Sequence, residues 1–346
     1  MYSHVLIIRE EAALHYQSNF QHFTHRFKRL WRRSRLILFI WVAWPAPADA
    51  FQGLPPTPET IWSAWNLEPS ILAILIVIAW GYFRGVRRLW RRAGLGRGIH
   101  VWQAVAFSAG LLVLLAALVS PLGALGTALF SVHMLQHLLL MIVAAPLLVL
   151  GAPLLPLIWA LPKPARQALG RWWRKANLVR SLWQNLSQPL LVWLLYGFTL
   201  WIWHLPALYQ AALEQVVIHE LEHITFFGTA LLFWWVLIQP IGHRRMNYGA
   251  GVLFIFTTAL HSGALGALLT FAQRPLYPIY VARAWNTTAL EDQQLAGLIM
   301  WIPMGVIYLI TALVLLALWL QTTEQRVRRR EAAYQLSADN DPIRYY

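Results

Sequence analysis

Two pairs of histidines stand four residues apart in this 346-residue sequence: His133 with His137, and His219 with His223. On an α-helix, residues at positions i and i+4 lie on one face, with about 5–6 Å between their Cβ atoms. Two imidazoles at that separation can bind one metal ion at about 2.0–2.1 Å. One such pair is a weak indication of a metal site, but two pairs in one protein make a metal site more plausible than either pair alone. The alternative is interhelical hydrogen bonding by neutral histidines.

Further candidate ligands lie near these pairs. His204 and His261 fall in neighbouring apolar segments, and we expect them to act as additional ligands or as a relay. Thioethers are soft ligands, and carboxylates can bind a metal or orient an imidazole N–H. The secondary candidates of these two kinds are Met134, Met300, Met304, Glu220, Glu222 and Asp292. The chain has no Cys, so imidazole and thioether favour copper, with zinc and haem iron as alternatives.

The second pair also matches a catalytic motif. His219-Glu220-Leu221-Glu222-His223 has the H-E-x-x-H pattern of zinc metalloproteases, in which Glu220 would be the general base. That interpretation explains neither His133 nor His137, so we do not expect an enzyme. A haem-binding electron-transfer protein is a second alternative, because histidines from two facing helices can bind haem iron axially. A third is a transporter that moves copper across the bilayer, although few polar residues continue to the inner side.

The composition indicates that these histidines are carried by membrane helices. Apolar residues make up 58% of the chain and charged residues 12%, against about 45–50% and about 25% in soluble domains. Such an excess cannot be buried in one globular core. Seven apolar segments approach the ~20 residues that a transmembrane helix needs. We therefore predict an all-α, polytopic membrane protein, a seven-transmembrane-helix bundle with spans at about 66–84, 99–119, 130–150, 188–205, 217–239, 250–272 and 294–320.

The positive charge indicates how the bundle is oriented. The net charge is +14, and outside the first fifty residues Lys and Arg concentrate in loops 85–98, 160–187 and 240–249 and in the tail. Only Arg274 and Arg283 lie in the other connections. By the positive-inside rule, the first span begins outside the cell and the C-terminus is cytoplasmic. The charge is thus a topology signal rather than a nucleic-acid surface, and five of the six candidate histidines fall on the outer side, with His261 deeper.

The ends of the chain have a different character from the bundle. Residues 1–50 combine a basic region, nine apolar residues and an A-x-A site ending at Ala50, which together predict a signal or leader segment. The alternative is a retained interfacial helix. Residues 51–65 are predicted to be an extracytoplasmic lead-in, 66–322 the seven-helix transmembrane domain, and 323–346 a cytoplasmic tail.

Three blocks of residues around the histidines resemble the seven-helix CtaG family of cytochrome c oxidase assembly factors. The first is His133 to Leu140 with Ala145–Leu148 and Gly151–Pro153. The others are Trp203–Tyr209 with His219–Phe226, and Tyr277–Tyr280 with Asp292–Pro303. The resemblance covers about residues 60–322 and leaves out the leader and the tail.

This resemblance implies a role in assembling a haem–copper terminal oxidase in the bacterial cytoplasmic (inner) membrane. It implies copper delivery or insertion from the periplasmic side. The expected partners are membrane lipid, haem–copper oxidase subunits and a periplasmic copper chaperone, with no nucleic acid. The metal-ligand roles come from residue spacing and not from the resemblance.

Overall fold

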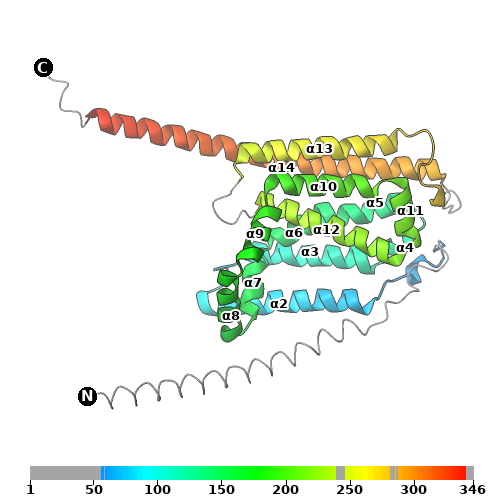
Figure 1. Ribbon diagram of the computed structural model, residues 1–346, viewed down its shortest axis with the longest axis horizontal. Helices are drawn as coiled ribbons and strands as arrows, with labels where there is room; N and C mark the ends of the chain where they lie inside the picture. Colours follow the sequence, from blue (N-terminus) through cyan, green and yellow to red (C-terminus); the bar gives the residue numbers. More distant parts are fainter. Residues whose placement is uncertain (1–55, 58, 239–245, 281–284, 286, 340–346) are drawn as a thin grey trace, which may run out of the picture. The chain divides into compact units, whose positions relative to one another are not determined.

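The computed structural model describes residues 56–339, apart from 58, 239–245, 281–284 and 286 (Figure 1). The predicted leader 1–50, part of the predicted lead-in and the last seven residues of the predicted tail lie outside the described residues. Within the described residues all regular structure is helical and there is no strand, which confirms the all-α prediction.

Six helical segments are long and apolar enough to cross a membrane, so the chain is a multi-pass membrane protein. They are α2 (Pro69–Ala93), α3 (Val101–Val119), the segment Phe130–Leu150, α12 (Val216–Ile238), α13 (Tyr248–Thr270) and the first part of α14 (Ala289–Asp339). Each coincides with a predicted span to within several residues, although α2 runs nine residues further than predicted and α14 continues as one helix through most of the predicted tail.

The fourth predicted span, 188–205, coincides with one short helix, α10 (Pro189–Trp203). A further helix, α9 (Asn177–Leu186), lies within the predicted loop 160–187 and meets α10 at a bend of 65°. Pro189 restricts the preceding Gln188 to an extended conformation, which ends α9. The 15 residues of α10 extend only about 22 Å at 1.5 Å per residue, less than the ~30 Å hydrocarbon core. The predicted seven spans are obtained only if this bent pair counts as one.

The third span lies at the centre of the bundle. In its most apolar 18-residue stretch 67% of the residues are buried, whereas the corresponding share is 22–39% in the other five candidate spans. It comprises α5 (Phe130–Leu138), a π-helical turn η2 (Leu139–Ala144) and α6 (Ala145–Leu150). Pro146 has no N–H for the carbonyl of Ile142, and its ring would clash with that carbonyl in an α-helix. A wider π turn makes room for the ring. It begins at Leu139, two residues after His137, and such turns are frequent at functional sites.

Two hydrophobic cores lie on either side of this central span. One joins it to α10, α12, α13 and α14, and the other joins it to α2, α3 and α7 (Leu154–Ala160). α5 packs against α14 and α4 (Leu122–Gly126), α12 packs against α10 and α6, and α13 runs beside α14 (Figure 1). The shorter helices are η1 (Ile61–Ser63), α8 (Lys163–Lys175), α11 (Pro206–Glu214) and η3 (Pro278–Tyr280). The central span therefore contacts helices from both halves of the chain.

Candidate metal centre

Both predicted histidine pairs face each other across α5 and α12. The ring centroids lie 4.4 Å apart in the His133–His137 pair and 4.3 Å apart in the His219–His223 pair. Between the helices, the centroids of His137 and His223 are 5.0 Å apart, and those of His133 and His219 are 5.8 Å apart. The four imidazoles therefore form a single group.

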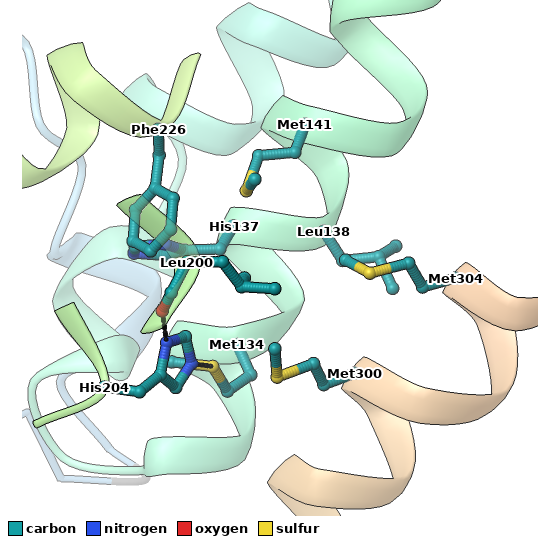
Figure 2. Close-up of a pocket in the computed structure, with 9 residues that line it drawn as sticks. All are labelled: Met134, His137, Leu138, Met141, Leu200, His204, Phe226, Met300 and Met304. Carbon is teal, nitrogen blue, oxygen red and sulfur yellow. Dashed lines mark hydrogen bonds between the residues drawn. The ribbon is translucent and has the colours of Figure 1, made fainter. Parts of the chain in front are cut away.

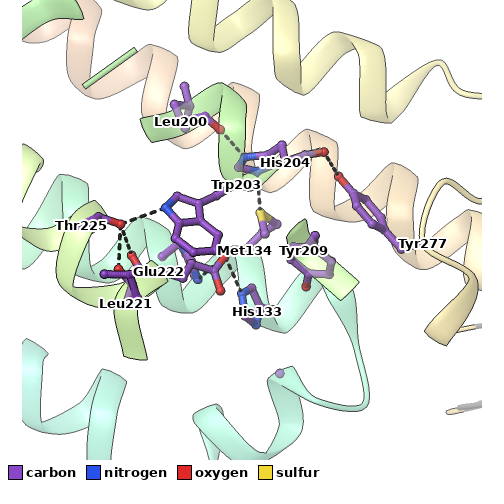
Figure 3. A network of polar contacts seen from close by, with 12 residues as sticks. His133, Met134, Leu200, Trp203, His204, Tyr209, Leu221, Glu222, Thr225 and Tyr277 are labelled. Carbon is purple, nitrogen blue, oxygen red and sulfur yellow. Dashed lines mark hydrogen bonds and ion pairs between the residues drawn. The ribbon is translucent and has the colours of Figure 1, made fainter. Parts of the chain in front are cut away.

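Glu222 adds a carboxylate to this group. Its Oε1 lies 3.7 Å from Nε2 of His133 (Figure 3). The same oxygen lies 3.9 Å from Nε2 of His137, and the Glu222 side chain is 1% exposed. These separations are longer than a hydrogen bond. No Lys or Arg forms an ion pair with Glu222 within the described part of the chain. A buried carboxylate without a cationic partner is costly. We call these five residues, His133, His137, His219, Glu222 and His223, the His/Glu cluster.

Several atoms of the His/Glu cluster lack hydrogen-bond partners. Within the described residues these buried atoms are Nε2 of His133, both ring nitrogens of His137, Oε2 of Glu222 and Nε2 of His223. Buried polar atoms in folded proteins are nearly always bonded. The unpartnered atoms argue against a purely hydrogen-bonded arrangement of neutral histidines. A bound cation would satisfy them together.

The ligand atoms form two overlapping sets of three. One set comes from His133, His137 and His223, and the other from His133, His219 and Glu222. Within each set the ligand atoms lie within 4.8 Å of one another. Three protein ligands leave a coordination position open, as in metal sites that exchange a ligand.

Asp292 contacts backbone rather than an imidazole, which differs from the expected orienting role. Its Oδ2 accepts a hydrogen bond from the Phe130 N–H at 2.6 Å, and its Oδ1 accepts from the Ser131 N–H at 3.2 Å and from the Ser131 hydroxyl. The first N–H groups of a helix have no partner within it and carry positive partial charge. Asp292 at the start of α14 therefore caps α5, which holds the helix that carries His133 and His137.

Glu220 is exposed, whereas Glu222 is buried. The predicted general base of the H-E-x-x-H motif thus points to the outside of the bundle. Since a metalloprotease needs that carboxylate beside the metal, the geometry disfavours the protease interpretation.

His204 and His261 do not join the His/Glu cluster. His204, at the end of α10, is buried and lies against Met134. His261 packs against the Trp193 ring with centroids 5.5 Å apart, and both of its ring nitrogens lack a partner among the described residues. Of the two histidines expected as additional ligands or a relay, His261 of α13 thus faces α10 rather than α5 and α12.

A cavity of about 10 Å³ lies beside the His/Glu cluster (Figure 2). Its lining contains the predicted Met134, Met300 and Met304, together with Met141, which sequence reasoning missed. The signal was available, because Met141 is four residues after His137 and seven after Met134 and so falls on their helical face. We call this the methionine cavity; it is lined by Met134, His137, Leu138, Met141, Leu200, His204, Phe226, Met300 and Met304.

Tyrosines cover the predicted outer end of the site. The Tyr209 and Tyr280 hydroxyls are hydrogen-bonded at 2.8 Å, and the Tyr277 hydroxyl donates to the His204 carbonyl at 3.0 Å. The Tyr209 ring also lies 5.3 Å from the His133 ring. Burial raises the pKa of Tyr277 and of Tyr209 above the ordinary value, so both phenols stay neutral. Sequence analysis did not single out Tyr209 as part of a site.

A comparison with known families decides what the bundle is. The family model described as cytochrome c oxidase caa3 assembly factor (Caa3_CtaG) matches residues 80–322. The chain belongs to this family. The match confirms the resemblance noted in the sequence, and it includes the whole His/Glu cluster and the methionine cavity. The Caa3_CtaG description is of an assembly factor and not of an enzyme, in agreement with the expectation from the sequence.

Curated relatives extend beyond this chain. Uncharacterized proteins of Mycobacterium bovis and Mycobacterium tuberculosis are each 30% identical over 320 residues, which is 89% of this chain and 46% of the relative. One from Mycobacterium leprae is 29% identical over 323 residues, 89% of this chain and 47% of the relative. The chain thus spans about half the length of these relatives. No solved structure matches the chain.

Proposed function

We propose that this Caa3_CtaG protein assists assembly of a haem–copper cytochrome c oxidase by holding copper as cargo in the His/Glu cluster and passing it to an oxidase subunit. The observation that carries the proposal is the set of unpartnered, buried ligand atoms on His133, His137, Glu222 and His223. We further propose that the protein acts in the bacterial cytoplasmic membrane, with the cluster near the outer face.

The donor atoms favour copper over other cargo. Neutral imidazoles bind both copper and zinc, but copper binds more strongly to a given nitrogen and oxygen site in the Irving–Williams order. Four methionine thioethers lie in the adjoining cavity, and soft sulfur ligands favour Cu(I). Zinc is the competing cargo, and direct metal analysis separates the two.

The two overlapping ligand sets suit a carrier better than a permanent store. His133 belongs to both sets, whereas His137 and His223 belong to one and His219 and Glu222 to the other. An ion can therefore exchange its remaining ligands while His133 stays bound. The open position in each three-ligand set is available to a ligand from a partner.

Space disfavours the haem alternative. Pockets for organic cofactors typically measure about 300–1,000 Å³, whereas the methionine cavity measures about 10 Å³. The imidazoles of α5 and α12 are also in close contact, with the His137 and His223 centroids 5.0 Å apart. A porphyrin between these two helices would require them to separate.

The proposal includes three kinds of partner. We propose that haem–copper oxidase subunits receive the copper and that a periplasmic copper chaperone supplies it. The membrane provides the third partner, lipid, which surrounds the exposed apolar faces of the spans.

Elemental analysis of the purified full chain after copper loading tests this proposal. We expect the wild-type protein to retain copper and to show no Soret band. The His133→Ala/His137→Ala double variant should lose the copper that the His/Glu cluster binds and therefore show a lower ratio of copper to protein. His261→Ala is the matched control, since His261 is an intramembrane histidine outside the cluster, and it should retain copper. Thermal unfolding in detergent establishes that both variants are folded. A folded double variant with undiminished copper content would contradict the proposal.

A further inference from the structure

The methionine cavity contains an unusual concentration of one residue type. Four of the six methionines in the chain line it: Met134 and Met141 from the central span, and Met300 and Met304 from α14. Met300 and Met304 are at i and i+4 and share a helix face. Figure 2 shows the Met300 side chain extending from α14 toward Met134 and His204.

The proton on His204 can be assigned from its contacts. Its Nδ1 lies 2.6 Å from the Leu200 carbonyl oxygen, which can only accept a hydrogen bond. Nδ1 must therefore carry a proton and donate it. In a neutral imidazole the other nitrogen, Nε2, then has a lone pair and no proton.

This lone pair faces a second acceptor. Nε2 of His204 lies 3.4 Å from Sδ of Met134, and a thioether sulfur also has only lone pairs to offer (Figure 3). Two acceptors that face each other in a buried site do not satisfy one another. A cationic His204 would supply a proton, but His204 takes part in none of the ion pairs among the described residues. A soft metal cation would satisfy both atoms.

We propose that the methionine cavity is a second metal site, distinct from the His/Glu cluster, which takes a monovalent soft cation of the Cu(I) type. Its ligands are Nε2 of His204 and the sulfurs of Met134 and Met300, with Met141 and Met304 completing a thioether lining. Imidazole and thioether together select Cu(I) over harder divalent ions. The cavity of about 10 Å³ is close to the smallest volume that holds one water, about 10–15 Å³, so it suits a single ion rather than an organic ligand.

The two sites share His137. This residue belongs to the ligand set with His133 and His223, it also lines the methionine cavity, and both of its ring nitrogens are unpartnered. Cu(I) can therefore pass between the sites by ligand exchange at His137, without a change of oxidation state. The identity of the natural cargo rests on the proposed function, whereas the existence of a soft-metal site does not.

Silver(I) tests the cavity directly, because it is a soft monovalent ion that does not undergo redox chemistry here. The full chain is first loaded with Zn(II) to occupy the His/Glu cluster and is then titrated with Ag(I). We expect the Met134→Leu/Met300→Leu variant, which is nearly isosteric, to bind one fewer Ag(I) per chain than the wild type. Met246→Leu is the matched control, since Met246 lies outside the cavity, and it should bind as the wild type does. Equal Ag(I) binding by the double variant and the wild type would overturn the proposal.

Two further measurements separate this proposal from the proposed function. The His133→Ala/His219→Ala variant alters the His/Glu cluster alone, and we expect it to lose Zn(II) but keep Ag(I). If the His/Glu cluster of the wild type binds neither copper nor zinc, the proposed function is wrong. The difference in Ag(I) binding between the wild type and the Met134→Leu/Met300→Leu variant still tests the methionine-cavity site in that case. X-ray absorption of the Cu(I)-loaded wild type needs no variant: sulfur scattering at the metal supports the cavity site, and its absence overturns it.

Discussion

Oε1 of Glu222 lies 3.7 Å from Nε2 of His133 across the interface between α12 and α5. This contact places a carboxylate inside a group of four imidazoles, where no Lys or Arg among the described residues compensates its charge. The same helix carries Glu220, which is exposed. The two glutamates of one motif therefore have opposite environments, and only Glu222 can contribute to a metal site between the helices.

Substitution of Glu222 is expected to weaken metal binding without changing the fold. Glu222→Gln keeps the size of the side chain and removes its charge, and we expect about a 10–100-fold loss of metal affinity, the range found when groups supporting a metal site are removed. The affinity of the purified protein for Co(II), read from its visible absorption, provides the measurement. Glu220→Gln is the matched control and should bind normally. Equal affinities for the two variants would show that Glu222 does not act at the site.

Loss of the α5 cap is expected to destabilise the protein. Asp292→Ala removes the acceptor for the N–H groups of Phe130 and Ser131, and loss of a helix cap costs about 0.5–2 kcal/mol. We expect a lower unfolding temperature in detergent and weaker metal binding, since α5 carries His133. Glu324→Gln serves as the control, because its ion pair with Arg328 is exposed and such pairs contribute about 0–1 kcal/mol. An Asp292→Ala protein with the unfolding temperature of the wild type would be evidence that Asp292 does not cap α5.

Removal of the Tyr277 hydroxyl is expected to change stability in a pH-dependent way. Tyr277→Phe deletes the hydrogen bond to the His204 carbonyl, a loss of about 0.5–1.5 kcal/mol. Because burial raises the pKa of Tyr277 in the folded protein, the unfolded chain releases the phenolic proton first as the pH rises. The stabilisation from Tyr277 is then complete below about pH 10 and declines above it.

Chemical or thermal unfolding at a series of pH values measures this effect. The difference in stability between wild type and Tyr277→Phe should be constant up to about pH 10, the ordinary pKa of tyrosine, and should shrink at higher pH. A difference that grows at high pH would contradict the buried, neutral phenol.

The predicted membrane orientation can be tested with single cysteines, since the chain has none. Ala207 in α11 and Ala168 in α8 are both exposed. We expect Ala207→Cys to react with a membrane-impermeant maleimide in cells whose outer envelope is permeabilised but whose cytoplasmic membrane is intact. Ala168→Cys should react only after the cytoplasmic membrane is permeabilised as well. The reverse labelling pattern would show that the bundle has the opposite orientation, with the His/Glu cluster near the inner face of the membrane.

Local features of this protein could be predicted because they depend on residues close together in the chain. A helix repeats every 3.6 residues, so the spacing of His133 and His137 is enough to place them on one face. Apolar runs of membrane length likewise predict the spans, since a lipid environment requires continuous apolar helices. The fourth span was predicted to begin at residue 188, whereas helix α9 (Asn177–Leu186) before it was predicted only as part of a loop.

Contacts between distant segments required the tertiary structure. Asp292 caps a helix whose first residue precedes it by 162 positions, and no periodicity relates the two. The rotation of α12 about its axis decides that Glu222 rather than Glu220 faces α5, and the packing of α13 against α10 turns His261 away from the other histidines. The sequence by itself determined the helices, their faces and the types of ligand they carry, because these follow from short-range backbone geometry and apolar length. Only the tertiary structure decided which ligands meet and which methionines surround His204, because side-chain packing sets the rotation and register of each helix.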